Sequence, residues 1–179
     1  SMLKDALDAF TRGDVALAGL MAKPGEPEGT ARADRFRWNL ADQRGVLDGT
    51  PFVVVTQGDS TITAPRIVLE SPEIIVLKGP KQVYLRQERE GRVETVAATC
   101  EGDLVMDPSA GRIAMRNACL LRTPDFAIRA DRVDGILDPR TRGIESFRAA
   151  GRVRTVQARD GAVILGSRLA YRPATGELT

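Results

Sequence analysis

Aspartates at expected turns are the first residues of this chain that could do chemistry. Asp42, Asp107 and Asp138 stand at such positions, and the last two are followed directly by proline. A pair of carboxylates could serve general acid–base catalysis. An aspartate at a turn, however, commonly accepts hydrogen bonds from backbone N–H groups. We adopt the turn role for all three residues.

Two Asp-Arg pairs invite comparison with β-helical enzymes that cleave polysaccharides. They lie at 34–35 and 131–132. We interpret both as solvated strand ends, because surface charge is the ordinary state of these residue types. The segment from Gly58 to Thr61 (GDST) predicts no phosphate site, because no helix is expected to follow it. The chain is therefore predicted to be non-enzymatic, with no catalytic residue, no metal site and no cofactor.

The composition excludes further classes of function. Histidine is absent from the 179 residues, which removes the commonest general base, the Ser-His and Cys-His nucleophile pairs and most zinc sites. The formal net charge is +2 and the two signs are interspersed, so we expect no nucleic-acid partner. No run of about 18 apolar residues occurs, so no membrane span is expected in this fragment.

The elements that must position these residues are mainly β-strands. From Ala31 onward apolar and polar residues alternate with period two, which is typical of strands. Similar strand–turn–strand segments recur about every 30 to 37 residues, a spacing that indicates repeated supersecondary units. They begin at Ala33, Ala64, Glu101, Ala130 and Gly166. The sequence predicts an all-β, antiparallel domain of roughly a dozen short strands.

The first thirty residues follow a different pattern. The apolar residues between Leu3 and Phe10 have helical spacing, and Asp14 could cap a second short turn before a Pro/Gly/Glu linker. We predict a short N-terminal helical arm and linker over residues 1–30 and a β domain over residues 31–179. Ser1-Met2 resembles a cloning remnant, and the chain ends within an expected hairpin, so we expect a β domain truncated at its C-terminus.

The hairpin around Asp107 allows a register to be predicted. If Met106 pairs with Ile113, facing residues keep a constant index sum of 219. Cys100 then faces Cys119 on the apolar side of the hairpin. A cross-strand disulfide, which would imply an oxidising compartment, and a pair of buried reduced thiols are both compatible with this register.

A single apolar face recurs on most of the predicted strands. This pattern suits a folded-over sheet with an apolar interior and a charged exterior. The residues expected to face inward are Trp38, Leu40, Ile67, Leu69, Leu104, Met106, Ile113, Met115, Phe126, Ile128 and Leu169. The arginines expected at the rim are Arg37, Arg152 and Arg168. They could contact a phosphorylated lipid head group, but for any single arginine we favour a role in a soluble face of interspersed charge.

Two segments resemble the OstA-like, or LptA-like, domain of the lipopolysaccharide-transport (organic solvent tolerance) family. They are PFVVVTQGDSTITAPRIVLESPEIIVLKGPKQVYLRQ, from Pro51 to Gln87, and AAGRVRTVQARDGAVILGSRLAYRPATGELT, from Ala149 to Thr179. The resemblance extends over about 145 residues, from Ala33 onward. The leading arm and the two cysteines are not part of the family pattern.

Short motifs within these segments carry the resemblance. The family pattern begins with a Gly-x-Val strand and a following Gln, which Gly151-Arg152-Val153 and Gln157 match. It continues with Ala-Asp, one variable residue and a hydrophobic residue, which the segment from Ala130 to Val133 matches. The segment from Ala64 to Ile67 departs from the pattern, because Pro65 stands where the family has Asp.

The resemblance implies a β-jellyroll, also called a β-taco, whose two sheets form an open V around acyl chains. It implies a periplasmic, non-enzymatic module that binds lipopolysaccharide or a related acylated lipid. It also implies partners, namely other OstA-like domains or further copies of the chain, that join edge to edge by strand addition.

Two other classes of protein have a similar amphipathic repeat. A structural β-solenoid-like scaffold or assembly domain would have a filled core, whereas a lipid carrier would have an interior that admits chains. The long and uneven spacing of the segments favours hairpins over the short regular rungs of a solenoid. A β-helical polysaccharide-active enzyme is disfavoured because no acidic cluster is evident.

Overall fold

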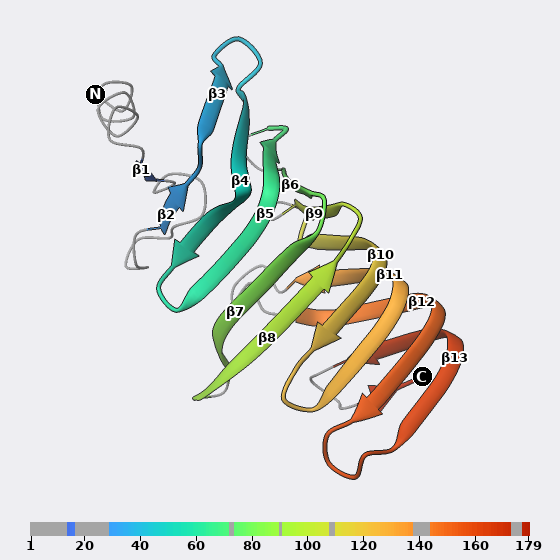
Figure 1. Ribbon diagram of the computed structural model, residues 1–179. Coiled ribbons are helices and arrows are strands. Elements are labelled where there is room, and N and C mark those ends of the chain that lie inside the picture. The colour runs from blue at the N-terminus through green and yellow to red at the C-terminus, as the bar shows by residue number, and fades with distance from the viewer. Residues whose placement is uncertain are drawn as a thin grey trace.

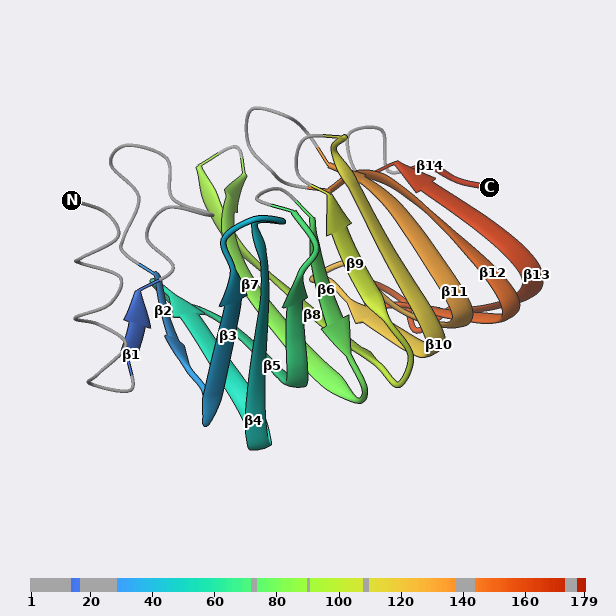
Figure 2. The same cartoon turned by 90° about the horizontal axis from the view of Figure 1, so that it is seen from above.

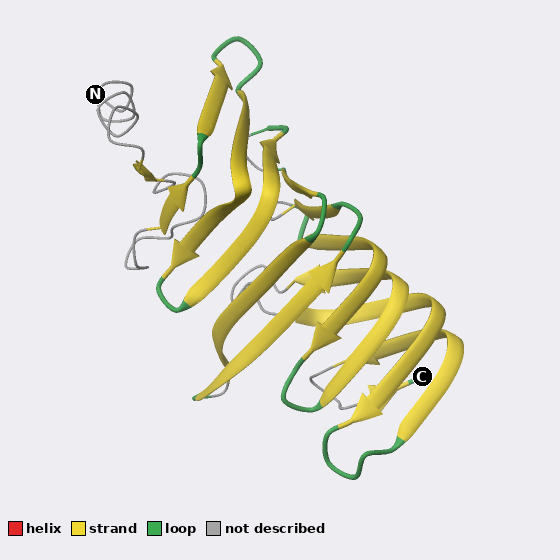
Figure 3. Cartoon of the chain, viewed as in Figure 1, coloured by secondary structure: helices red, strands yellow, loops and turns green. Residues whose placement is uncertain are grey.

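The computed structural model describes residues 14–16, 29–71, 74–89, 91–107, 110–137, 144–172 and 177–179. All regular structure in these ranges is β-strand (Figure 3). The described residues accordingly contain no helix long and apolar enough to cross a membrane. Every strand pair recorded among them is antiparallel, which confirms the predicted fold class.

The strands join into one continuous fourteen-stranded sheet. In chain order they are β1 (Asp14–Ala16), β2 (Gly29–Arg32), β3 (Arg35–Asn39), β4 (Arg44–Gln57), β5 (Ser60–Leu69), β6 (Ile75–Lys78), β7 (Lys81–Arg89), β8 (Arg92–Cys100), β9 (Leu104–Asp107), β10 (Arg112–Arg122), β11 (Phe126–Leu137), β12 (Ile144–Gln157), β13 (Val163–Arg172) and β14 (Glu177–Leu178). Several strands are longer than the short strands we predicted, because each of these runs through a bend without ending there.

The long strands change partners midway, so the sheet folds into two walls (Figures 1 and 2). We call the first wall β2, β7, β8 and the strand halves that pair with them, and the second wall β3, β6, β9, β14 and the remaining halves. The line between the walls, which we call the fold line, follows breaks in register. The breaks fall between Asp48 and Val53 in β4, Arg116 and Cys119 in β10, Arg129 and Arg132 in β11, and Ala150 and Val153 in β12.

Residues at the fold line have backbone conformations that turn a strand. Gly151 and Arg152 have φ angles of 74° and 46°, and Asn117 and Ala118 have φ angles of 61° and 48°. Consecutive residues in this left-handed region interrupt the ladder and redirect the strand, as a bulge does. A Cβ atom at Gly151 would lie 2.6 Å from Asp131 Oδ2, so this corner also requires glycine for space.

Five hairpins repeat along the second wall, in agreement with the five segments recognised in the sequence. They are β3–β4, β5–β6, β9–β10, β11–β12 and β13–β14. Connections between strands of the first wall alternate with them along the chain. Each repeat therefore adds one hairpin to the second wall, which explains why the pattern recurs although no catalytic group is evident on it.

The predicted index sum of 219 holds on both sides of the fold line. All pairs between β9 and β10 keep this sum. Beyond the break, β8 replaces β9 as the partner of β10, and Thr99 pairs with Leu120 at the same sum. Cys100 therefore faces Cys119, although the ladder is interrupted beside them.

Most of the predicted N-terminal arm lies outside the described residues, including the segment from Leu3 to Phe10 for which a helix was expected. The described part is β1, which pairs antiparallel with β2. Asp14, which was expected to cap a helical turn, pairs with Arg32 in this ladder. That expectation is wrong because the backbone groups of this segment bond to a sheet edge.

Candidate functional site

Two rows of side chains cross the inner face of the second wall. Facing residues of antiparallel strands project to the same side, so successive pairs define each row. The row beside the fold line consists of Phe36, Leu47, Ile67, Leu77, Leu104, Met115, Val133, Ala149 and Leu169. We call the side of each wall farthest from the fold line, where the strands end, its rim. The row nearer the rim consists of Trp38, Gly45, Leu69, Ile75, Met106, Ile113, Gly135, Phe147 and Tyr171. Both are continuous apolar strips from β3 to β13.

A matching row crosses the inner face of the first wall. It consists of Ala31, Val55, Ile62, Val83, Ala98, Leu121, Ile128, Thr155 and Ile164. Only Thr155 is polar, and its fully buried hydroxyl has no hydrogen-bond partner among the described residues. The two inner faces together enclose an apolar interior that extends along the whole sheet.

Most residues predicted to face inward belong to one hydrophobic core within this interior. Ile113 is partly buried and packs against that core. The buried members are Ile67, Leu69, Leu104, Met106, Met115, Phe126, Ile128 and Leu169.

Trp38 and Leu40 are exposed, in contrast to the other residues expected inside. Trp38 keeps the inward phase, because its ring lies over Gly45, where an added Cβ would approach Cε3 to 2.6 Å. It remains 37% exposed because β3 pairs only with β4 among the described strands and so has a neighbour on one side. Leu40 is 67% exposed. The inward prediction is wrong for Leu40, because β3 ends at Asn39 and the turn interrupts the alternation.

Three aromatic rings connect the two walls towards the C-terminal end of the sheet. Phe126 belongs to the first wall, whereas Phe147 and Tyr171 belong to the second. The Phe126 ring centroid lies 4.5 Å from that of Tyr171 and 5.4 Å from that of Phe147. All three residues are buried. Aromatic pairs contribute about 0.5–1.5 kcal/mol beyond their buried area, so this cluster holds the walls together.

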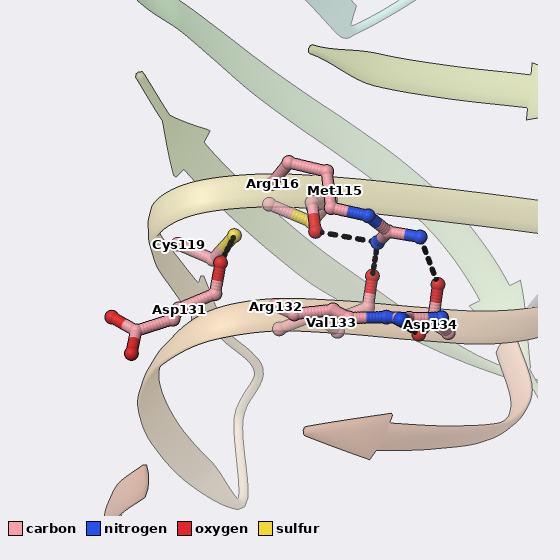
Figure 4. A network of polar contacts seen from close by, with 7 residues as sticks. All are labelled: Met115, Arg116, Cys119, Asp131, Arg132, Val133 and Asp134. Atoms are coloured by element: carbon pink, nitrogen blue, oxygen red, sulfur yellow. Dashed lines mark hydrogen bonds and ion pairs between the residues drawn. The ribbon is translucent and has the colours of Figure 1, made fainter. Parts of the chain in front are cut away.

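A lysine and both cysteines of the chain meet on the inner face of the fold line. Lys81 on β7 pairs with Cys100 on β8, which in turn faces Cys119 on β10. Their exposed fractions are 3%, 3% and 2%. Lys81 Nζ donates a hydrogen bond to Gly102 O, and Cys119 Sγ donates one to Asp131 O over 3.7 Å (Figure 4). Both cysteines are free thiols in the structure, which is the reduced alternative of the two considered.

The environment of this cluster separates the pKa values of its thiols. A hydrogen bond from the Cys119 thiol, aided by the nearby Lys81 ammonium, lowers the pKa of Cys100 to about 7. The same hydrogen bond, together with burial, raises the pKa of Cys119. Burial lowers the pKa of Lys81, while both thiols and Asp103 act against that shift. Cys100 is therefore the thiol that ionises first.

The sequence analysis missed the position of Lys81. The segment GPKQVYLRQ, from Gly79 to Gln87, alternates in the sequence as the other predicted strands do. In that alternation Lys81 has the same phase as Val83, and both are buried. A lysine at a strand position where alternation predicts a buried apolar side chain is the feature that would have identified this residue.

The three arginines expected at the rim lie elsewhere. Arg37 is on the outer face of the second wall, where Nη2 donates to Asp48 Oδ2 at 3.3 Å. Arg152 lies in the fold line and donates from Nε and Nη2 to Asp131 Oδ1, at 3.1 and 2.6 Å. Arg168 is exposed beside the fold line. The rim prediction is wrong because the bends place Arg152 and Arg168 at the closed side of the sheet, and Arg37 lies within β3 between the positions of Phe36 and Trp38.

Two other arginines lie at opposite rims. Arg112 is the first residue of β10, in the second wall, and Arg122 is its last residue, in the first wall. Both are exposed, and neither forms an ion pair within the part of the chain that the structure describes. β10 thus has one exposed arginine at each of its two ends, one at the rim of each wall.

The aspartates considered for catalysis have structural roles where they are described. Asp107 Oδ1 accepts a hydrogen bond from the Ala110 N–H at 2.9 Å, which confirms its turn role. Asp42 Oδ2 accepts one from Asn39 Nδ2 at 2.8 Å within the turn that follows β3. Asp138 lies outside the described residues. No group of three His, Cys, Asp or Glu in the described ranges could hold a metal ion.

The Asp-Arg pair at 131–132 is divided between two charged contacts. Asp131 bonds to Arg152 at the fold line, as described above, while Arg132 joins a network on the outer face (Figure 4). There Asp134 accepts hydrogen bonds from Arg132 Nε at 2.5 Å and from Arg116 Nη2 at 2.7 Å. Burial raises the pKa of the Asp134 carboxyl, but the two guanidinium groups outweigh it, so the pKa is lowered. The network ties β10 to β11 and offers no free acid–base pair.

Comparison with known proteins gives a likeness in structure. No protein-family model matches the sequence, and no curated protein sequence matches it significantly. The structure is similar to that of LptH from Pseudomonas aeruginosa, the LptA homologous periplasmic component of the conserved lipopolysaccharide transport device. The TM-score is 0.55 at 13% sequence identity, over 78% of this chain and 94% of LptH. The chain therefore folds as an LptA-like domain, as the resemblance in sequence implied.

Proposed function

We propose that this domain is a non-enzymatic carrier of lipopolysaccharide or a related acylated lipid. The observation that carries the proposal is the continuity of the three apolar rows, which run without a charged residue from one end of the sheet to the other. An acyl chain is apolar along its whole length, so it can contact apolar side chains all along such a row. The LptA-like fold, seen in a periplasmic lipopolysaccharide-transport component, supports the same function and a periplasmic location.

Burial of methylene groups supplies the driving force. Each buried CH₂ group gains about 0.8 kcal/mol, so one acyl chain of a dozen carbons gains several kcal/mol after the cost of ordering it. The interior side chains lie against one another, with Leu47, Leu104 and Ile128 fully buried. Lipid entry must therefore part the walls, which would separate Phe126 from Phe147 and Tyr171.

The proposed assembly uses the ends of the sheet. The edges considered for strand addition lie near Trp38 and near Tyr171. β3, which carries Trp38, pairs only with β4 among the described strands, so its other edge can accept a strand. Tyr171 itself pairs with Leu178 on β14, so at that end the open edge is the first half of β13, from Val163 to Gly166. If the edge of β3 in one domain pairs with the edge of β13 in a sister domain, the apolar rows continue from one domain to the next.

A structural scaffold with a permanently filled core is the second candidate. The near-complete burial of interior residues favours it, because a packed core needs no ligand. The two candidates differ in one respect, which is whether the inner faces ever contact lipid.

Photo-crosslinking separates these candidates with a matched control. Trp38 lies on the inner face and Tyr84 on the outer face, and both are partly exposed, at 37% and 45%, so each tolerates a photoreactive phenylalanine analogue. With a fluorescent lipid A analogue at micromolar concentration, we expect crosslinks from position 38 and not from position 84. Equal labelling of both positions would indicate non-specific contact, and no labelling of either would favour the scaffold.

A pair of substitutions at one interior position completes the test. Met115→Glu places a charge in the row beside the fold line, whereas Met115→Leu keeps an apolar side chain of similar volume. We expect the glutamate variant to lose binding of the lipid A analogue and the leucine variant to keep it. Circular dichroism establishes that each variant retains its strands, and a folded Met115→Glu protein that binds normally contradicts the proposed path.

A further inference from the structure

We propose that Cys100 and Cys119 are a redox-active dithiol that closes to a disulfide at the fold line, with Cys100 as the attacking thiol and Lys81 as the cation that stabilises its thiolate. The proposal is independent of the lipid-carrier function, since it rests on the geometry of three strands alone.

The register brings the two sulfur atoms together without any rearrangement of the sheet. Cys100 and Cys119 continue the index sum kept by the neighbouring pairs, so their side chains project from facing positions onto the same side. Facing residues in an antiparallel pair have Cα atoms about 4.5–5.5 Å apart, within the range that a disulfide spans. Each thiol donates to a backbone carbonyl at the fold line, Cys100 Sγ to Gly102 O and Cys119 Sγ to Asp131 O, over 3.7 Å in both cases.

The surroundings assign different roles to the two thiols. Lys81 pairs directly with Cys100 and brings its ammonium group beside that sulfur, whereas Cys119 lies one strand farther away. Cys119 Sγ donates a hydrogen bond to Asp131 O over 3.7 Å. The attacking species in disulfide exchange is the thiolate, so the lowered pKa of Cys100 supports its role as the first nucleophile.

The reaction needs a disulfide as the oxidant. The Cys100 thiolate attacks one sulfur of that disulfide, whose S–S bond breaks, and the first departing thiolate takes the proton that Cys100 had released. The Cys119 thiol then attacks Cys100 Sγ in the mixed disulfide, and its proton passes to the second departing thiolate. Two protein thiols are oxidised to one disulfide, and the oxidant is reduced to two thiols.

Access is confined to one place in the sheet. Both sulfurs belong to residues with little exposed surface, but Glu101, Asn117 and Ala118 beside them are exposed. The regular ladder between β8 and β10 ends at Thr99 and Leu120, and beyond it Glu101 N–H and Gly102 N–H donate to Asn117 O and Arg116 O around the irregular segment. A small disulfide such as glutathione disulfide is therefore the suitable probe.

Intact mass measurement after incubation with glutathione disulfide tests the proposal. These two residues are the only cysteines in the chain, so any thiol chemistry reports on them. Under native conditions we expect loss of the mass of two hydrogen atoms, loss of alkylation by N-ethylmaleimide, and a peptide that links Cys100 to Cys119. The disulfide closes a loop of roughly twenty residues, so its formation should be on the order of a hundredfold more favourable in the folded protein than in urea. Equal equilibrium constants in the two states, or thiols that stay alkylatable, overturn the proposal.

Variants test the separate roles. Cys119→Ser should accumulate a mixed disulfide of Cys100 with glutathione, whereas Cys100→Ser should react far more slowly. Lys81→Met should slow alkylation of Cys100 at neutral pH and move the midpoint of its pH–rate profile upward. The reverse order of reactivity overturns the assigned roles, and an added oxygen atom bridging Lys81 and Cys100 in place of a disulfide overturns the proposed product. Should a variant fail to fold, alkylation of the wild-type protein with limiting reagent identifies the faster cysteine directly.

Discussion

Phe126 and Tyr171 belong to opposite walls of the folded sheet, yet their rings meet edge to face with centroids 4.5 Å apart. Both rings also contact Phe147, with centroids 5.4 Å away in each case. The other buried residues of the described inner faces are mainly aliphatic. The aromatic cluster is therefore a direct contact between the two walls.

The first prediction removes this contact. Phe126→Ala should lower the free energy of unfolding by about 3–5 kcal/mol, because it deletes a buried ring and leaves a cavity between the walls. Denaturant titration measures the change. The control is Leu165→Ala on the outer face, where the side chain is 73% exposed, with an expected change within about 0.5 kcal/mol. If the proposed lipid path is correct, Phe126→Ala should also bind the lipid A analogue faster than the wild type. A variant as stable as the wild type would show that the rings do not hold the walls.

Local sequence pattern was enough to predict the hairpins and their facing residues. Alternation assigns each side chain to a face, and a turn such as that around Asp107 fixes which residues pair. The inward phase of Leu104 and Met115 followed directly from these two facts, and their burial agrees. The bends could not be predicted in this way, because they depend on positive φ angles at residues such as Asn117 and Ala118, which turn signals in the sequence do not mark.

The arginine positions show the consequence of missing the bends. Alternation alone does not show where a strand bends, so the sequence predicts Arg152 and Arg168 at the rim. Once each strand crosses from one wall to the other, the middle of the strand lies at the closed side and its two ends lie at the open side. The candidates for head-group contact thus become Arg112 and Arg122, which terminate β10.

The second prediction concerns the inner face near the fold line. Leu104 is fully buried in the row that contains Met115. Leu104→Asp should destabilise the domain by several kcal/mol, since it buries an unpaired carboxylate. Val163→Asp, on a side chain that is 50% exposed, is the control and should change the melting temperature little. An unchanged melting temperature for Leu104→Asp would contradict the assigned face of β9.

The third prediction addresses the rim arginines. Replacing either Arg112 or Arg122 by Gln should weaken binding of the lipid A analogue only modestly, because an exposed cation contributes about 1 kcal/mol or less. The loss should shrink as salt is raised, since salt screens exposed charges over about 10 Å at 0.1 M ionic strength. The matched control is Arg37→Gln on the outer face, which should leave affinity unchanged. Equal losses for all three variants would exclude a specific role of the rim.

The last prediction uses the charged network outside the fold line, where Asp134 accepts hydrogen bonds from Arg116 and Arg132. The two arginines hold the pKa of this carboxyl below its ordinary value despite the opposing effect of burial. A carboxyl with a depressed pKa in the folded state contributes stability that is fully present above the unfolded pKa of about 4. That contribution is lost as the pH falls through the folded pKa. Because the Asp134 side chain is 36% exposed, solvent screening limits it to about 1 kcal/mol.

Asp134→Asn should therefore lower the free energy of unfolding by up to about 1 kcal/mol at pH 7 and by progressively less below pH 4, where the wild type loses the same charge. Urea titrations at a series of pH values measure both curves. The control is Asp125→Asn, at an exposed residue outside this network, for which the two curves should run parallel. A constant gap between Asp134→Asn and wild type down to strongly acidic pH would mean that the hydrogen-bond geometry, and not the charge, ties β10 to β11.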